Sequence, residues 1–583
     1  MRLASLILLF LSGYAMAQSG VKQSPYASKN QNGPLNAIKM RLGLPVLTHG
    51  PGYDFGDVPQ SFVNTGSAIY SYNANQCGWG FTVTSLTQNT GVAGSTGANT
   101  CTSPGTGDTI QSNGILSFTP NTIAAIPPAQ NTNICGSWPE ASYKVGVTWF
   151  MLVHDEGPCN YAVFGQTNES MSMWTSSTGA PGSWSPMVVG GVSNGTIISS
   201  TEAPTSGPLA LTGFGNGSMI PDENGQWMYA YVSFFSASNL SDYHNAVARA
   251  PMTALGPGNW MMEYQGCFCI PALNNTFNTV SQLPNADLFP LWINSAVATM
   301  PGSAYKVIVV DGFDHAFNIP TQETYNGIAL SIALSYTGPF TTLHSPILNY
   351  DTQTFGGRPL PSDSYVYAII KNNSDGSSVL SKNSAALWTM WMPPNNSLNS
   401  RYVVEYPITI SSLSKTDQNF RVPQIAISLE TYQNTSSGNP YSGSARSTTV
   451  NPAAGISSDG AIETGWAAQS FLGYILTSCP GSATINACDA NGAQIANRIE
   501  ECWSGATLDD YQLQIDTNGT AGSCPSGWTH VRTAGWLYKH AQAFGTTAIY
   551  ACSRTATGTH FSSISSTCNG QTFIALLGYA ASN

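Results

Sequence analysis

One order of events recurs five times between residue 51 and about residue 410, and it restricts the fold more than any other feature. A loop with a polar or acidic residue precedes an apolar strand, a turn follows, and a second strand ends near Trp or Ser. The repeat length, about 70–80 residues, exceeds the roughly 40–50 residues of WD and kelch blades. The copies are DVPQSFVNTGSAIYSYN (57–73), WPEASYKVGVTWFMLVHDE (138–156), GSMIPDENGQWMYAYVSFF (217–235), DLFPLWINSAVATMPGSAYKVIVVDGF (287–313) and GRPLPSDSYVYAIIKN (357–372).

Each copy is long enough for four short strands joined by Gly, Pro and Asn turns, and five such units make a five-bladed β-propeller. A two-sheet sandwich explains the strands but not five copies of one order. The chain has 57 Gly and 35 Pro and lacks long helical patterns rich in Ala, Glu, Lys and Leu, which is typical of β proteins. We therefore predict an all-β protein, with a five-bladed β-propeller followed by a small disulfide-rich β module.

Outside the repeats, the chain divides by composition. Residues 1–17 combine Arg2, an apolar run and the small-residue site Ala15-Met16-Ala17, which predicts a cleaved signal peptide and a secreted, extracellular protein. A membrane anchor is disfavoured because the apolar run is shorter than the roughly 20 residues that span a bilayer. The predicted divisions are a signal peptide (1–17), an N-terminal extension (18–50), the propeller (51–434), a Ser/Gly/Pro-rich linker (435–460) and a Cys-rich repeat or binding module (461–583).

Cysteine usage agrees with export, because 12 cysteines fall mostly in close pairs and such pairs form disulfides in an oxidising compartment. Proximity suggests the pairs Cys77/Cys101, Cys135/Cys159, Cys479/Cys488, Cys502/Cys524 and Cys552/Cys568. Proximity predicts no disulfide partner for Cys267 or Cys269. A zinc site is disfavoured because there is no second C-x-x-C and no cluster of His.

The charge pattern limits the partners. Only 8% of residues are Asp, Glu, Lys or Arg, the net charge is −11, and no basic cluster is present, so we expect no nucleic-acid partner. A monomer that binds a neutral glycan or polysaccharide fits better. Nine N-x-Ser/Thr sequons would allow a glycoprotein, although a chain this rich in Asn, Ser and Thr also produces sequons by chance; they begin at Asn168, Asn194, Asn216, Asn239, Asn274, Asn372, Asn395, Asn434 and Asn518.

Carboxylates recur near the predicted blade starts. In a propeller the innermost strands of all blades begin near one axis, so residues distant in sequence converge on one pocket. The candidates are Asp54 and Asp57, then Glu140, Asp287 and the basic Arg358. Glycoside hydrolysis uses two carboxyl groups, one that protonates the leaving oxygen and one that activates water or attacks. A third carboxylate could raise the pKa of the acid by charge repulsion.

Short motifs in residues 51–410 resemble those of the five-bladed propeller glycosidases of the arabinanase, xylosidase and invertase type. Asp57-Val58-Pro59 leads to Gly66 and Tyr70. Trp138-Pro139-Glu140 leads to Gly146 and Trp149-Phe150, and Asp222-Glu223-Asn224-Gly225 precedes Trp227 and Tyr229. The resemblance implies a general base at Asp57 and a modulating carboxylate at Glu140.

The chain departs from that family at the third blade, where Ser218 stands in place of an acidic residue. The only Glu-Gly-Pro is Glu156-Gly157-Pro158, so the general acid stays open between Glu156, Asp287 and Glu202. His154, Trp138, Asp54 and Arg358 are candidates for substrate binding. Each site residue also has a structural alternative, such as turn capping for Asp54 and Asp57, or a paired His154-Asp155 at a strand end.

The C-terminal region carries a weak internal repeat, QSFLGYILTS (469–478) and QTFIALLGYAAS (571–582). It resembles short Cys- and Leu-Gly-Tyr-containing repeats appended to secreted proteins, which implies attachment or binding. We therefore expect a secreted glycoside hydrolase that acts on a neutral polysaccharide or oligosaccharide. The alternative is a non-catalytic, lectin-like propeller. No cofactor is required and no metal ligands are assigned, although oxygen-rich loops would suit Ca²⁺.

Overall fold

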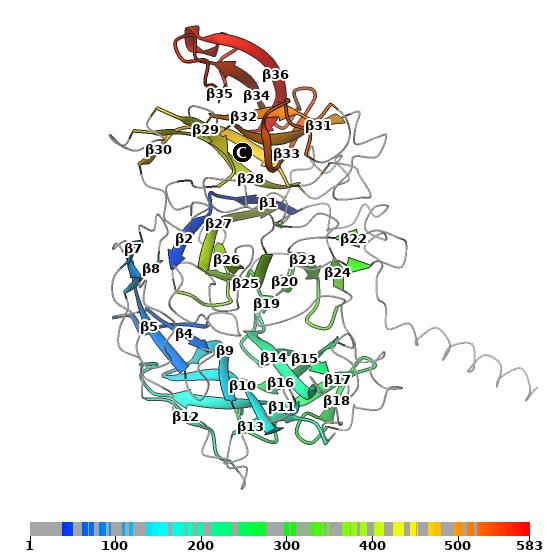
Figure 1. Cartoon of the computed structure of the whole chain (residues 1–583). Coiled ribbons are helices and arrows are strands. Elements are labelled where there is room, and N and C mark those ends of the chain that lie inside the picture. Colours follow the sequence, from blue (N-terminus) through cyan, green and yellow to red (C-terminus); the bar gives the residue numbers. More distant parts are fainter. Residues whose placement is uncertain are drawn as a thin grey trace, which may run out of the picture.

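The computed structural model of the chain (Figure 1) is built from β-strands in the part that it describes, and the helical element with described bounds is the short 3-10 turn η6 (Cys568–Gly570). The described residues are 38–49, 61–67, 69–74, 81–88, 92–94, 108–110, 116–119, 136–160, 166–180, 183–189, 195–201, 211–235, 243–275, 297–301, 305–310, 317–318, 324–325, 328, 330–338, 340–342, 347–348, 364–372, 375–381, 385–392, 402–412, 424–435, 443–450, 452, 465–477, 479, 495–504, 510–517 and 522–582. No described helix is long and apolar enough to cross a membrane.

Five antiparallel strand units follow one another along the chain, one for each predicted repeat. Blade 1 holds β3 (Ser61–Asn64), β4 (Ile69–Ala74), β5 (Phe81–Gln88) and β8 (Leu116–Thr119). Blade 2 holds β9 (Gly136–Val145), β10 (Thr148–Asn160), β11 (Gln166–Ser176), β12 (Ser185–Pro186) and β13 (Thr196–Ser199). Blade 3 holds β14 (Leu211–Pro221), β15 (Trp227–Phe235), β16 (Tyr243–Pro251), β17 (Met261–Tyr264) and β18 (Cys267–Pro271).

Blade 4 holds β19 (Val297–Ala298), β20 (Val307–Val310), β23 (Leu330–Ala333) and β24 (Phe340–Thr342). Blade 5 holds β25 (Ser364–Asn372), β26 (Ala385–Met392) and β27 (Tyr402–Ser412). Two further hairpins lie off the blades, β6 (Val92–Gly94) with β7 (Asp108–Ile110) and β21 (Phe317–Asn318) with β22 (Thr324–Tyr325).

The first strands of successive blades contact one another, from β3 to β9, β14, β19 and β25, which places them innermost. Ring closure between the last blade and the first is marked by Trp388 of β26 and Phe62 of β3, whose ring centroids lie 5.2 Å apart. This is the predicted five-bladed propeller.

Apolar side chains fill the gaps between neighbouring blades. One cluster joins blades 1 and 2 through Val63, Met151 and Val153, and another joins blades 2 and 3 through Leu152 and Phe214. Separate clusters lie between blades 3 and 4 and between blades 4 and 5. The alternation of Met151, Leu152 and Val153 explains this arrangement, because successive side chains of a strand point to opposite faces of its sheet.

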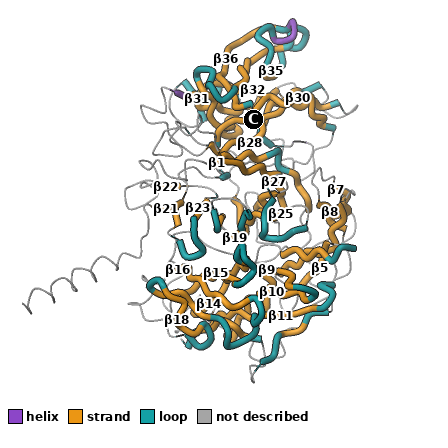
Figure 2. Tube along the Cα trace, turned by 180° about the vertical axis from the view of Figure 1, so that it is seen from behind, coloured by secondary structure: helices purple, strands orange, loops and turns teal. Residues whose placement is uncertain are grey.

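An N-terminal strand completes blade 5. β1 (Ile38–Leu42) pairs antiparallel with β27 and parallel with β28 (Gln424–Asn434), and β2 (Val46–His49) also pairs with β27. Figures 1 and 2 both show β1 between the propeller and the module above it. The described part of the predicted N-terminal extension is therefore built into a sheet that runs through both parts of the molecule.

The C-terminal module consists of three repeats of three strands. In each repeat the first strand pairs with both the second and the third. The repeats are β28, β29 (Ala445–Thr448) and β30 (Trp466–Leu476), then β31 (Ala496–Ser504), β32 (Asp510–Ile515) and β33 (Thr529–Tyr538), and finally β34 (Thr546–Ser553), β35 (His560–Ser563) and β36 (Thr572–Ala581). Part of the segment predicted as a linker is thus β29, where residues 444–450 are buried.

The third strands of the repeats close on one another with threefold symmetry. Leu476 of β30 pairs with Trp536 of β33, Tyr538 of β33 with Tyr579 of β36, and Ala581 of β36 with Tyr474 of β30. One glycine in each strand allows this approach: Gly473, Gly535 and Gly578, with φ of 139°, 141° and 148°. A Cβ at Gly473 would lie 2.7 Å from Ala580, and one at Gly578 would lie 2.7 Å from Leu537.

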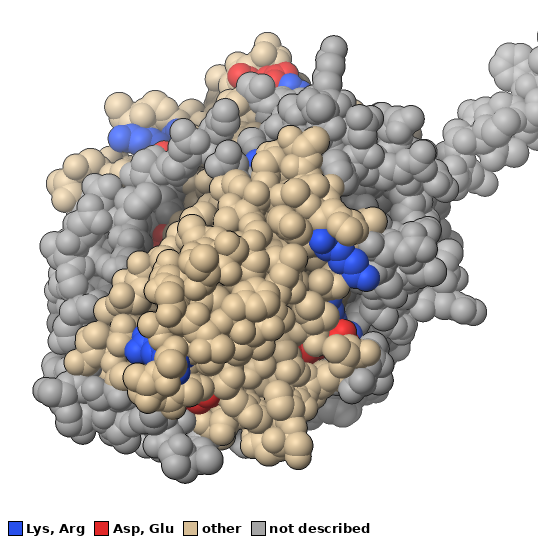
Figure 3. Space-filling view, turned by 90° about the horizontal axis from the view of Figure 1, so that it is seen from above, with Lys and Arg blue, Asp and Glu red and all other residues tan. Residues whose placement is uncertain are grey.

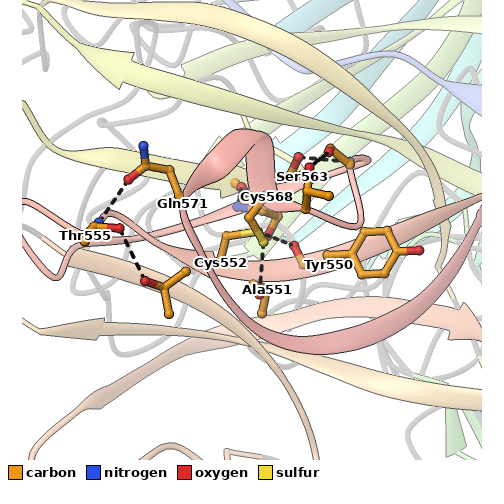
Figure 4. Close-up of a disulfide and its surroundings, with 12 residues drawn as sticks. Tyr550, Ala551, Cys552, Thr555, Ser563, Cys568 and Gln571 are labelled. Atoms are coloured by element: carbon orange, nitrogen blue, oxygen red, sulfur yellow. Dashed lines mark hydrogen bonds between the residues drawn. A yellow bond between two sulfur atoms is a disulfide. The ribbon is translucent and has the colours of Figure 1, made fainter.

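Disulfides confirm two predicted pairs, Cys502–Cys524 and Cys552–Cys568, both in the module. Figure 4 shows the second one, which joins β34 to the turn η6, with Tyr550 beside it. Cys267 and Cys269 bond to each other, and Cys479 is also disulfide-bonded. The predicted pairs Cys77/Cys101 and Cys135/Cys159 involve cysteines outside the described residues. Two sequons begin at the buried Asn372 and Asn434, where a glycan would not fit.

Candidate functional site

Glu140 lies on the innermost strand of blade 2, at a β-bulge. In the pairing of β9 with β10, Ala141 faces Leu152 and Pro139 faces Val153, so Glu140 is the extra residue. Bulges redirect a side chain and are enriched beside active sites. Its side chain is fully buried. A carboxylate buried at this point needs partners within the protein, because an isolated buried charge is costly.

His154 supplies one such partner and links Glu140 to a second carboxylate, Glu169. The Nδ1 atom of His154 lies 3.6 Å from Oε1 of Glu140, and its Nε2 atom lies 3.4 Å from Oε2 of Glu169. All three side chains are at most 6% exposed. The imidazole can hold a proton between two carboxylates, and its charge would favour their ionised forms.

Sequence analysis had not identified Glu169, which lies on β11 opposite Glu156. An available signal was its position as the only acidic residue in an otherwise uncharged strand, QTNESMSMWTS. The same pairing corrects the idea of a His154-Asp155 pair. As strand neighbours these residues point to opposite faces, and the carboxylates near His154 are Glu140 and Glu169. In the antiparallel pairing of β9 with β10, His154 lies opposite Trp138, near the start of β9.

Blade 3 makes room for this group with glycine. A Cβ at Gly215 of β14 would collide with the carboxylate of Glu169 and would lie 3.0 Å from Cε1 of His154. A Cβ at Gly213 would strike the backbone oxygen of Glu169. The Gly-rich start of β14 therefore seals the histidine and its carboxylates between two blades.

Trp138 packs against the histidine, with ring centroids 5.5 Å apart, and is half-buried. Trp138 therefore lies beside His154, and its contact with a substrate stays a prediction. For Glu156 the structure describes the backbone only, opposite Glu169 in the β10–β11 pairing.

Two more innermost strands are bulged near their middle. β14 has an extra residue at Asn216, with φ of 46°, and β25 is irregular between Val366 and Ile369, where Tyr367 has φ of 58°. Positive φ is unusual for a bulky residue and is held only where the surroundings enforce it. Together with β9 at Glu140, three of the five innermost strands therefore depart from regular pairing in their described residues.

Four predicted site residues lie outside the described residues: Asp54, Asp57, Asp287 and Arg358. The alternative acid Glu202 is outside as well. In the chain they stand ahead of described innermost strands: Asp54 and Asp57 before β3, Asp287 before β19 and Arg358 before β25. Ser218, the departure at blade 3, is buried and donates a hydrogen bond to the carbonyl of Val297 in blade 4.

Lys371 of β25 interacts electrostatically with both Glu140 and Asp375. Burial lowers its pKa to about 7, while Asp375 and Glu140 act in the opposite direction. Its Nζ donates to Ser378 Oγ at 2.7 Å. Asp375 lines a cavity of about 550 Å³ at the ends of β3 and β9, with walls formed by Phe62, Asn64, Thr65, Gly66, Ser142, Tyr143, Lys144, Trp149, Ser377 and Val379.

Within the described residues no group of three or more His, Cys, Asp and Glu side chains has a geometry that could hold a metal ion. The described site residues supply carboxylates, one imidazole and one buried amine. This set can tune protonation states and transfer protons.

Comparison with known proteins gave matches among solved structures only: no family model and no curated protein matches the chain. An α-L-arabinofuranosidase from Lactobacillus brevis is 10% identical and aligns with a TM-score of 0.34 over 62% of this chain and 90% of its own. A family 117 glycoside hydrolase from Zobellia galactanivorans is 9% identical and aligns with a TM-score of 0.34 over 65% of this chain and 92% of its own. The GH43_1 enzyme from Xanthomonas citri complexed with xylose is 11% identical and aligns with a TM-score of 0.33 over 65% of this chain and 93% of its own.

Proposed function

We propose that this protein is a secreted glycoside hydrolase that cleaves a neutral polysaccharide or oligosaccharide with paired carboxylates. The observation that carries the proposal is Glu140, buried at a bulge of an innermost strand and linked through His154 to Glu169. A propeller with few charges keeps three buried ionisable groups together here, and carboxylates beside a histidine can transfer protons.

In this mechanism Asp57 is the base or nucleophile, and Glu156 or Asp287 is the acid that protonates the leaving oxygen, with Glu202 as the remaining alternative. Glu140 acts on them through its charge, which His154 and Glu169 adjust. Trp138, Asp54 and Arg358 contact the sugar. His154 is nearly covered, so it positions Glu140. Ca²⁺ is included in the proposal as an optional ligand of the oxygen-rich loops.

A non-catalytic glycan-binding propeller is the second candidate, and one observation favours it. Ser218 stands where an acidic residue would be expected in blade 3, and its hydroxyl is buried in a hydrogen bond to Val297. A propeller that lacks this acid could still hold a glycan over the same innermost strands.

The test is release of reducing sugar from arabinans, xylans, fructans, mannans and galactans, with Ca²⁺ present. We expect Asp57→Asn to reduce the rate by about 10²–10⁴-fold and Glu140→Gln to reduce it at least tenfold. Glu223→Gln is the matched control, since Glu223 lies on the propeller surface beside Lys306. Thermal unfolding shows whether each variant is folded. Glycan binding by folded wild type and variants alike, without release on any substrate, would replace the enzyme with the lectin-like candidate.

A further inference from the structure

The three repeats of the module meet at junctions that can be compared position by position. Each third strand is preceded by a glycine with positive φ, at Gly465, Gly527 and Gly570, and the next residue is Trp466, Trp528 or Gln571. Trp466 packs edge-on against Tyr511 of the second repeat, and Trp528 packs edge-on against His560 of the third. Tyr511 and His560 occupy equivalent positions in β32 and β35.

The first junction is closed. Trp466 is 5% exposed and Tyr511 is 2% exposed. The guanidinium of Arg446 lies 4.4 Å from the centroid of the Tyr511 ring and covers it. This junction contributes to the core and presents no aromatic surface to a ligand.

The third junction has no aromatic pair. Its equivalent of the tryptophans, Gln571, accepts a hydrogen bond from the backbone of Thr555 within its own repeat, as Figure 4 shows.

The second junction is open at the surface. The side chains of His560 and Asp510 are 22% and 14% exposed, and Trp528 is half-buried. The rings of Trp528 and His560 stand nearly perpendicular, with centroids 5.2 Å apart. The same structural position that fills the core in one repeat pair therefore faces solvent in the next.

Hydrogen bonds at the open junction fix the orientation of the imidazole. Asp510 accepts from the backbone N–H of His560 and from its Nδ1, both at 2.7 Å. In the neutral ring this leaves Nε2 as an acceptor. Among the described residues, neither Nε2 of His560 nor the indole N–H of Trp528 has a hydrogen-bond partner. One donor and one acceptor are therefore presented side by side, next to an aromatic ring.

The surroundings hold both rings in place. The Cys502–Cys524 bridge anchors the loop that leads to Trp528, whose backbone N–H donates to Pro525. The Cys552–Cys568 bridge anchors β34, which pairs with His560 through Ser553. A pre-ordered site loses less conformational entropy when it binds a ligand. Figure 3 shows that the described surface at the module end is mostly uncharged, with few Lys, Arg, Asp or Glu side chains.

We propose that the junction between the second and third repeats is a binding site for a neutral sugar residue, formed by Trp528, His560 and Asp510. The apolar face of the sugar packs on Trp528, and neighbouring hydroxyls contact the indole N–H, Nε2 of His560 and the carboxylate of Asp510. Aromatic surface combined with a few placed polar groups is the usual composition of a small-ligand site. The proposal is independent of catalysis by the propeller.

The experiment is calorimetric titration of the full chain with the methyl glycosides of arabinose, xylose, galactose, mannose and glucose. We expect saturable binding of at least one glycoside, weakened at least tenfold by His560→Ala and by Trp528→Phe, which keeps a ring but removes the indole N–H. His540→Ala and Phe573→Ala are matched controls, because both residues are exposed in the same module and lie outside the site.

Three outcomes would overturn the proposal: no binding of any glycoside, equal binding by wild type and both site variants, or equal weakening by the control variants. Thermal unfolding of each variant excludes a loss of fold, and Trp528→Phe is conservative enough to fold if His560→Ala does not. Sugar release by the propeller, measured on the same variants, should be unchanged on soluble oligosaccharides. These two measurements distinguish a failure of the proposed sugar site in the module from a failure of the proposed glycosidase activity in the propeller.

Discussion

The propeller and the module stabilise their interiors in different ways. Between propeller blades the buried apolar side chains form continuous clusters, and the buried ionisable groups include Glu140, His154 and Glu169 of blade 2 and Lys371 of blade 5. The module, built from far shorter repeats, contains most of the described ion pairs, together with two disulfides and three closely packed glycines. A small domain buries a smaller fraction of its surface, so it depends more on such specific contacts.

The centre of this difference is Glu501, which lies between Arg446 and Arg532 with all three side chains buried. Burial alone would raise the pKa of Glu501, but the two arginines more than offset this and hold the pKa below its ordinary value. The hydroxyl of Thr448 contacts both Glu501 and Arg532. The propeller shows no comparable pair of arginines around one carboxylate in its described part.

Removing the negative charge from this group should have the largest effect. We expect Glu501→Gln to lower the free energy of unfolding of the module by about 3–5 kcal/mol, because two buried guanidinium groups lose their counter-ion. Differential scanning calorimetry would measure the loss. Glu430→Gln is the control: burial disfavours the charged form of Glu430 and raises its pKa, so the loss of this charge should cost less. Equal losses in the two variants would contradict this account.

The second prediction concerns the buried amine of the propeller. Lys371 has a pKa of about 7 in the folded chain against 10.5 for an ordinary lysine. Between these values the unfolded chain binds more protons, so the stability of the wild type rises with pH across this window. We therefore compare the free energy of unfolding of Lys371→Met with that of the wild type. The difference, variant minus wild type, should be roughly 2–4 kcal/mol larger at low pH than above pH 10.

Denaturant unfolding of both proteins between pH 6 and 10.5 would test this sign. The difference in unfolding free energy, variant minus wild type, should decrease as pH rises. Asp375 and Glu140 limit its size, because both favour the charged amine. Parallel curves for the two proteins would mean that Lys371 stays charged in the fold.

The smallest of the three effects concerns threefold closure of the module. Gly535→Ala places a Cβ 2.5 Å from the carbonyl oxygen of Leu476 and 2.9 Å from the side chain of Ile475. We expect a loss of about 2 kcal/mol. Gly545→Ala is the matched control, since its φ is also positive but no atom lies within 4 Å, and it should cost about 1 kcal/mol. A calorimetric comparison that ranks the two variants equally would show that strand contact is unimportant.

Repetition made the fold predictable from sequence. Five copies of one strand order predicted the five blades, and cysteine proximity predicted the disulfides Cys502–Cys524 and Cys552–Cys568 but not Cys267–Cys269. The threefold module was recognised only in part. The first and third repeats share Leu-Gly-Tyr, whereas the middle one reads Ala534-Gly535-Trp536, so its likeness lies in the backbone conformation of glycine rather than in the side chains.

The candidate site was less predictable. Glu140, His154 and Trp138 were predicted as site residues and lie close together in the structure, because a short antiparallel turn brings β9 and β10 together. Their roles stay predictions. Glu169 was missed, since its proximity depends on the register of β11 and on the space left by Gly215. Register and side-chain room of this kind arise from tertiary packing and leave little trace in a single sequence.

The strand β1 has a consequence for the order of assembly. Its residues, 38–42, are synthesised early, but both its partners, β27 and β28, follow several hundred residues later. Contacts this distant in sequence form slowly, because a long chain must first be brought together. The earliest described strand is therefore among the last to find its place, and until then blade 5 and the module each present an unsatisfied edge. A chaperone or an aggregating neighbour would compete for that edge during folding.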